Sequence, residues 1–260
     1  MITVSVGAPD GAATAARTNG IDGSSLIFVH GVGSTASIWD AQLRAFGGEH
    51  LCAAVELRGN GVPKPEPEPS LITREGYACD VLAVADALGM DRFTLVGCSL
   101  GGVLGFELWR RAPERIESLV IVGSFAAYPN ARAYVDGILT ALKEAGTMQA
   151  FAQLRAAKLG LSPERTRETM EQMACKDEHS YAAATEATWT GDYTAILDTI
   201  DVPTLVMCGE RDAIAPFALS KIIADGVRDA RLEVVPDAGH VANADAPDAF
   251  NKLLRAFLSA

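Results

Sequence analysis

The segment Phe93-Thr94-Leu95-Val96-Gly97-Cys98-Ser99-Leu100-Gly101-Gly102 decides the fold, because it predicts a buried strand, a sharp turn and a helix in immediate succession. The run 93–96 is apolar and rich in strand-forming residues, and apolar residues recur at helical spacing over 102–109. Glycines stand two positions before and two positions after Ser99, where side chains would collide with the neighbouring strand and helix. Ser99 is therefore a candidate nucleophile. A serine in front of a helix is also a common N-cap, so the choice depends on finding its partners.

Further short apolar runs predict strands on both sides of this segment, at 26–29, 51–57, 119–122, 204–208 and 232–235. Segments with helical periodicity separate most of them. One example places Tyr77, Val81, Ala85 and Leu88 on a single face. This alternation predicts an α/β fold with a mostly parallel sheet covered by helices on both faces. We also expect 2–6 and 14–17 to form an antiparallel pair leading into the sheet.

The alternation is interrupted between residues 122 and 204, where four amphipathic segments predict helices at 131–145, 148–158, 163–176 and 179–189. An insert that follows a strand at its carboxyl end lies over the crevice where such sheets bind ligands. We therefore expect a helical cap at 125–190 and a core formed by 1–124 and 191–260. The alternative is that these helices merely cover the flank of the sheet.

The composition is that of an ordinary globular protein: 260 residues, 49% hydrophobic, 21% charged, with a formal net charge of -11. This acidic balance predicts no partnership with nucleic acid or with anionic membrane surfaces. No apolar run is long enough to cross a bilayer, and the start of the chain does not resemble a secretory signal, so we expect a cytoplasmic protein. The five cysteines are widely spaced and contain no C-x-x-C pair, which predicts reduced thiols and no zinc site.

A serine hydroxyl needs an adjacent base, normally a histidine that a carboxylate orients. His240 follows the last predicted strand, at the same edge of the sheet as Ser99, and Asp212 follows the strand before it. Glu210 and Asp237 are competing carboxylates, but both are less suited to reach the far ring nitrogen. The order Ser99, Asp212, His240 is the one expected of an α/β-hydrolase triad.

The other histidines are less suited to the role of the base. His30 ends the first core strand, His50 precedes a strand on the side opposite the expected site, and His179 falls in the expected cap.

Taken together, these features resemble the α/β-hydrolase fold family, in its capped, esterase-like and lactonase-like branch that includes 3-oxoadipate enol-lactonases. Besides the Ser99 turn and the Asp212 and His240 loops, the matching motifs are His30-Gly31, with Trp39 a little later, and Arg58-Gly59-Asn60-Gly61. The family commonly has an aspartate before this arginine, whereas this chain has Glu56-Leu57. The resemblance implies an oxyanion hole formed by the backbone N–H groups of Val32 and Leu100, and a structural role for His30.

The activity that we expect is hydrolysis of a small carboxylic ester or lactone through an acyl-enzyme, with no metal or organic cofactor. The serine argues against dehalogenase and epoxide hydrolase chemistry, which use an aspartate nucleophile. Carbon–carbon bond hydrolysis, thioester hydrolysis and perhydrolysis would use the same triad and remain open. So do acyl transfer to another acceptor and a non-catalytic receptor that only binds a small molecule.

Four residues of the insert are candidates for the substrate pocket, with Trp189 placed before Phe125, Tyr128 and Met148. Aromatic residues at helical spacing also pack a cap onto itself, which is the alternative. An arginine that binds a substrate carboxyl group is left open among Arg132, Arg155, Arg165 and Arg167.

Overall fold

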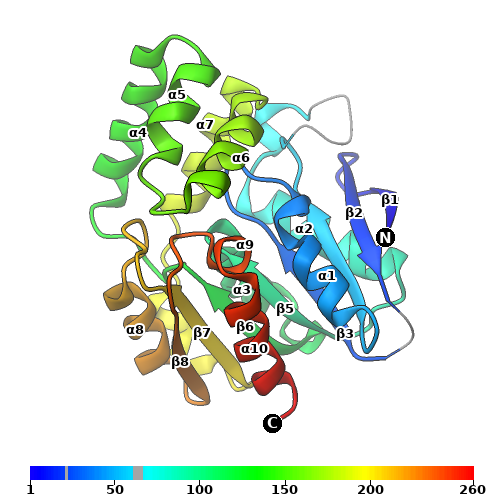
Figure 1. Cartoon of the computed structure of the whole chain (residues 1–260). Coiled ribbons are helices and arrows are strands. Elements are labelled where there is room, and N and C mark those ends of the chain that lie inside the picture. The colour runs from blue at the N-terminus through cyan, green and yellow to red at the C-terminus, as the bar shows by residue number, and fades with distance from the viewer. Residues whose placement is uncertain (21–22, 61–66) are drawn as a thin grey trace.

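A computed structural model describes all residues except 21–22 and 61–66, and it places the strands in one sheet of eight. Gly61 and the prolines at 63 and 65 lie outside the described residues. The strand order is β1-β2-β4-β3-β5-β6-β7-β8 (Figure 1). The bounds are β1 Ile2–Gly7, β2 Ala13–Asn19, β3 Ser25–Val29, β4 Leu51–Glu56, β5 Phe93–Cys98, β6 Ile116–Val122, β7 Thr204–Gly209 and β8 Ala230–Val235.

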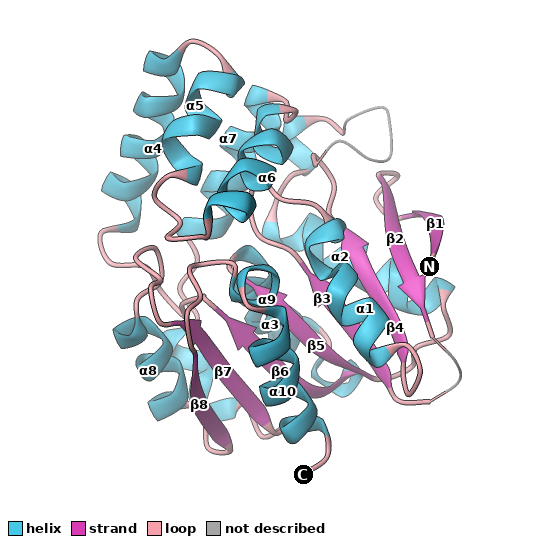
Figure 2. Ribbon diagram, viewed as in Figure 1, coloured by secondary structure: helices cyan, strands magenta, loops and turns pink. Residues whose placement is uncertain are grey.

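Strands β3 to β8 run parallel, as expected from the alternation of strands and helices. The expected N-terminal pair is confirmed: β1 pairs antiparallel with β2, and β2 joins β4 in the same orientation. In the central strands all side chains are buried, because helices cover both faces of the sheet (Figure 2).

Successive side chains of β3 belong to different cores, which shows how the two faces are filled. Leu26 and Phe28 pack with helices α1 and α10, whereas Ile27 and Val29 pack on the face covered by α2, α3 and α8. The helix bounds are α1 Asp40–Phe46, α2 Arg74–Ala87, α3 Leu100–Arg111, α8 Phe217–Gly226, α9 Ala242–Asp245 and α10 Pro247–Leu258. The predicted α/β fold is therefore confirmed.

Four helices lie between β6 and β7, and no strand is described among them: α4 Ala131–Ala145, α5 Met148–Ala156, α6 Pro163–Ala174 and α7 Glu178–Trp189. They correspond to the four predicted segments and begin and end within two residues of them. Figure 1 shows them grouped on one side of the molecule, beyond the ends of the strands. Within this group α5 packs against α6, and α4 packs against both α5 and α7. None of the helices described is long and apolar enough to span a membrane.

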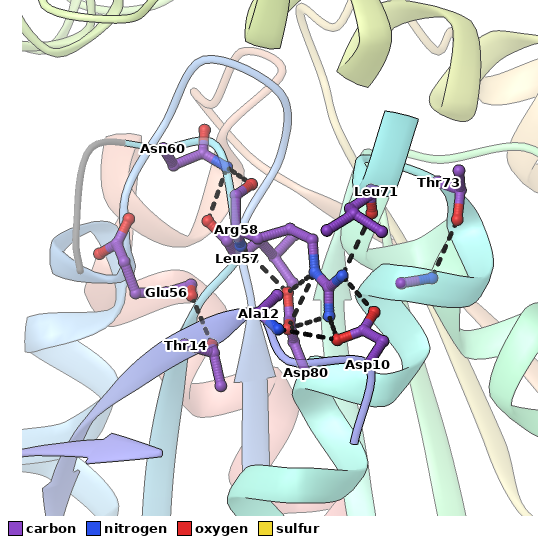
Figure 3. A network of polar contacts seen from close by, with 11 residues as sticks. Asp10, Ala12, Thr14, Glu56, Leu57, Arg58, Asn60, Leu71, Thr73 and Asp80 are labelled. Carbon is purple, nitrogen blue, oxygen red and sulfur yellow. Dashed lines mark hydrogen bonds and ion pairs between the residues drawn. The ribbon is translucent and has the colours of Figure 1, made fainter. Parts of the chain in front are cut away.

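Arg58 ties the loop after β4 to two distant parts of the chain (Figure 3). Its guanidinium is fully buried and donates to the buried carboxylate of Asp80 on α2 at 2.8 Å, and it also pairs with Asp10 between β1 and β2. The Arg58 backbone N–H donates to Asp80 as well. This network fixes the end of β4 against α2.

Candidate active site

Ser99 lies between β5 and α3 in a backbone conformation that is strained for a residue with a side chain, with φ 56° and ψ −113°. The turn is tight because the backbones meet closely. A Cβ on Gly97 would run into the Gly101 carbonyl, and one on Gly101 would run into the carbonyl of Val29. Glycine is therefore required at positions 97 and 101, because any side chain there would collide with backbone atoms. This tight turn places Ser99 at the carboxyl end of β5.

The side chains of Asp212 and His240 meet, although they come from loops after different strands. Asp212 Oδ2 lies 2.9 Å from His240 Nδ1, and the carboxylate is completely buried. Its Oδ1 also accepts hydrogen bonds from the backbone N–H groups of Ile214 and Ala215, both at 2.9 Å. These bonds aim the carboxylate at the ring, which favours the tautomer with the hydrogen on Nδ1, and Nε2 points away from Asp212.

Ser99 and His240 line the same cavity, which lies between the sheet and the helices α5, α6 and α7. The described residues contain no hydrogen bond between the Ser99 hydroxyl and the His240 ring. Such contacts are often long before a substrate binds and tighten only in the complex. The cavity is narrow, with a volume of about 40 Å³. This corresponds to a few water molecules and indicates a small ligand.

The loop after α5 fixes the helical insert to the loop that carries His240. The backbone N–H of His240 donates to the Leu159 carbonyl at 2.8 Å, and Ser162 N donates to Asp245 at 2.8 Å. Leu159 also lines the cavity. The roof of the cavity is therefore held in register with the histidine by backbone hydrogen bonds.

Two backbone N–H groups beside Ser99 are free to bind an oxygen atom. Val32 follows Gly31, where an added Cβ would come within 3.1 Å of the Ser99 Cβ, and Leu100 is the first residue of α3. Neither the Val32 nor the Leu100 N–H donates a hydrogen bond to any described residue. This is the arrangement expected where an oxyanion would bind at the start of a helix.

His30 is fully buried and is not among the residues that line the cavity. Its Nδ1 contacts the Gly31 carbonyl at 2.8 Å, and its Nε2 accepts from the Leu57 N–H at 3.1 Å. Burial lowers the pKa of His30 to about 3, so the ring is neutral at physiological pH. Nearby lies Glu56, which with Leu57 precedes Arg58 where the family commonly has an aspartate. Its carboxylate accepts a hydrogen bond from the Ala36 N–H at 2.9 Å, and burial raises the pKa of Glu56 to about 7. Both residues brace the loop that carries Val32.

The competing residues lie elsewhere. Glu210 and Asp237 are exposed and bond to each other, with Asp237 N donating to Glu210 Oε2 at 3.0 Å. His179 is exposed on α7, and His50 bonds Ser24 at the opposite end of the sheet. No group of three or more histidine, cysteine or acidic side chains suited to holding a metal occurs in the part of the chain that the structure describes.

Cys98 also lines the cavity, directly before Ser99. Burial, reinforced by the charge of Asp212, raises the pKa of its thiol. The thiol is therefore neutral, as expected for a cysteine that serves packing.

Of the four pocket candidates, only Trp189 lines the cavity. Phe125 stacks on the Trp189 ring at 4.9 Å between centroids, and Tyr128 meets it edge-on at 4.6 Å. Both therefore pack behind Trp189, as the packing alternative describes. Met148 is half-buried at the start of α5, outside the lining.

Sequence reasoning missed several lining residues of the insert: Leu159, Thr169, Met173 and Tyr181. It also did not decide which of four arginines binds a substrate carboxyl group, and of these four Arg155 lines the cavity. A signal for Arg155 exists in the sequence, because Phe151, Arg155 and Leu159 recur at spacings of four on the buried face of α5 and the turn after it. An arginine in such an apolar stripe is exceptional, since arginine is mostly exposed.

The fold and these side chains can be compared with known proteins. The alpha/beta hydrolase family model matches residues 26–253, and the chain belongs to this family. It is 31% identical over 254 residues to an Azorhizobium caulinodans protein provisionally named as the carbamate hydrolase RutD, covering 90% of this chain and 91% of that one. It is 27% identical over 243 residues to 3-oxoadipate enol-lactonase 2 of Acinetobacter baylyi, covering 91% and 89%.

A solved structure leads to the same class. A hydrolase from Pseudomonas aeruginosa superposes with a TM-score of 0.90 at 30% identity, covering 99% of this chain and 98% of that chain. The resemblance noted from the motifs is thus confirmed, and the protein is a hydrolase of the alpha/beta hydrolase family.

Proposed function

We propose that this protein is a serine hydrolase that cleaves a small carboxylic ester or lactone through an acyl-enzyme. Ser99 is the nucleophile, His240 the base and Asp212 the carboxylate that orients the histidine. The observation that supports this most is the 2.9 Å contact between Asp212 and His240 Nδ1, at a cavity that Ser99 lines from a strained turn.

The reaction proceeds in two halves. In the first, His240 Nε2 takes the Ser99 proton as the oxygen attacks the carbonyl carbon, and the ring then returns this proton to the leaving alcohol oxygen. In the second, a water molecule loses a proton to His240 and attacks the acyl carbon, the bond from this carbon to Ser99 Oγ breaks, and His240 returns the proton to Oγ as the acid leaves. In each half the Val32 and Leu100 N–H groups hold the negative oxygen, where a single donor contributes roughly 2.7–4 kcal/mol.

The insert at 125–190 serves as a cap over a core of residues 1–124 and 191–260. This division is supported by the position of Arg155, Met173, Tyr181 and Trp189, which enclose the cavity from the side opposite Ser99. Partial enclosure reduces the contact of the cavity with bulk water and strengthens the electrostatic interactions within it. Its small volume favours short acyl groups over long ones.

The direct test replaces Ser99 with alanine and measures turnover of short-chain nitrophenyl esters and of simple lactones. We expect kcat to fall by on the order of 10⁴-fold to 10⁶-fold, because the nucleophile is lost. The unfolding temperature should change little, because the substitution removes one oxygen atom that faces the cavity and leaves the packing unchanged. Ser37→Ala, which removes a hydroxyl outside this cavity, is the matched control and retains activity. Ester hydrolysis by Ser99→Ala at the wild-type rate would refute the nucleophile.

A further inference from the structure

Arg155 is the only permanently charged side chain among the described residues that line the cavity. It extends from α5 into a wall made mainly of apolar groups, such as Leu159, Met173 and Trp189. His240 lines the same cavity, and the Leu159 carbonyl binds the His240 N–H, so the turn that follows Arg155 is anchored to the catalytic loop.

Arg155 makes no ion pair with a carboxylate among the described residues, and its buried Nε has no hydrogen-bond partner there. Arg58, whose guanidinium is fully buried whereas Arg155 is half-buried, shows how this chain compensates such a group, with Asp80 and Asp10 both bound to it. A charged group removed from water without a counter-charge is costly, so such groups are normally paired. The contrast with Arg58 indicates that the partner of Arg155 is absent from the chain itself.

The neighbours of Arg155 keep it charged but do not neutralise it. Burial acts to lower the pKa of Arg155, and the nearby Tyr181 and Tyr134 phenols outweigh this effect, so its pKa is raised. Burial also raises the pKa of Tyr181, although Arg155 opposes this shift. The Tyr181 phenol is therefore neutral and offers a hydrogen bond without a negative charge.

We propose that Arg155 binds a carboxylate of the substrate, so that the ester or lactone cleaved at Ser99 carries a second, anionic group. This proposal rests on the serine hydrolase function proposed above and specifies its substrate class. A planar guanidinium matches the two oxygens of a carboxylate, and an apolar wall strengthens the contact because water is excluded. With its carboxylate bound to Arg155, a short substrate would present its carbonyl carbon to Ser99.

The test compares two esters of matched length, 4-nitrophenyl hydrogen glutarate and 4-nitrophenyl pentanoate, in which a carboxylate replaces a terminal methyl group. Arg155→Met should lower kcat/KM for the glutarate ester by between about 10-fold and 100-fold, mainly through KM, since the group is remote from the reacting bond. It should change kcat/KM for the pentanoate ester by less than about 3-fold. Arg155→Lys should recover part of the loss, because the charge returns without the planar fork.

Arg132→Met is the matched control. Arg132 also lies in the insert, but it is exposed and paired with Glu186, so neither ester should respond. Equal losses on both esters with Arg155→Met would assign Arg155 a structural role and overturn the proposal. Unchanged kinetics on the glutarate ester would overturn it as well.

A binding measurement separates this proposal from the proposed function. Calorimetry on Ser99→Ala with glutarate should show binding, whereas dimethyl glutarate, which lacks the charges, should bind at least about 10-fold more weakly. If the wild type hydrolyses neither ester while glutarate still binds through Arg155, the hydrolase function fails and the anion site stands. Equal affinity for glutarate and dimethyl glutarate would overturn the anion site, whether or not the Arg155 variants fold.

Discussion

At the scale of single residues, Asp212 has a fixed orientation because two backbone N–H groups bind its Oδ1, while Oδ1 and Oδ2 lie 3.0 and 2.9 Å from His240 Nδ1. Asp212→Asn tests what this orientation does. The amide oxygen would keep the bonds to Ile214 and Ala215, so the amide nitrogen would face Nδ1 and force the hydrogen onto Nε2. The ring could then no longer accept the Ser99 proton.

We therefore expect Asp212→Asn to lower kcat by on the order of 10⁴-fold, with an unfolding temperature close to that of the wild type. Steady-state kinetics and a thermal melt by circular dichroism check this. Glu210→Gln is the control, since this carboxylate is exposed and bonds only to the Asp237 loop among the described residues. A similar loss in both variants, or activity of Asp212→Asn within tenfold of wild type, would contradict the assigned role.

At the scale of elements, α3 can approach the sheet only because Gly101 has no side chain. A Cβ there would meet the Val29 carbonyl of β3, whereas one on the exposed Gly137 of α4 would meet nothing. Neither glycine has a positive φ, so the two sites differ in space and not in backbone conformation.

Gly101→Ala should therefore lower the free energy of unfolding by about 1–3 kcal/mol and reduce kcat, because α3 must shift and carries the Leu100 N–H with it. Gly137→Ala should raise the free energy of unfolding by about 0.5–1 kcal/mol and leave kcat unchanged. Urea titration with parallel assays of both variants provides the measurement. Equal stabilities for the two variants would show that the close approach of α3 to β3 is not required.

The order of elements was predictable because local patterns determine it. The glycines around Ser99 and the apolar run before it indicate the strand, turn and helix directly, and the interrupted alternation after 122 indicates α4 to α7. The ends of α5 and α6 fall two residues short of the predicted 158 and 176, because the chain turns at 157–158 and 175–176, and periodicity alone does not mark the last helical residue.

At the scale of the whole molecule, the sequence could place Ser99, Asp212 and His240 at one edge because parallel strands share that edge. It could not show which side of each helix from α4 to α7 faces inward. Phe125 and Tyr128 are aromatic residues of the insert, as Trp189 is, yet they pack behind it, and Arg155 was one arginine among four. These outcomes depend on how helices distant from the core pack against one another.

Covalent labelling measures the proposed reactivity of the Ser99 hydroxyl most directly. A fluorophosphonate should attach to the wild-type protein with a stoichiometry of about one, and mass mapping should place the label on the peptide that contains Ser99. In His240→Ala the labelling rate should fall by at least about 100-fold, because general-base assistance is lost. Label on any other residue, or labelling of Ser99 at the same rate without His240, would contradict it.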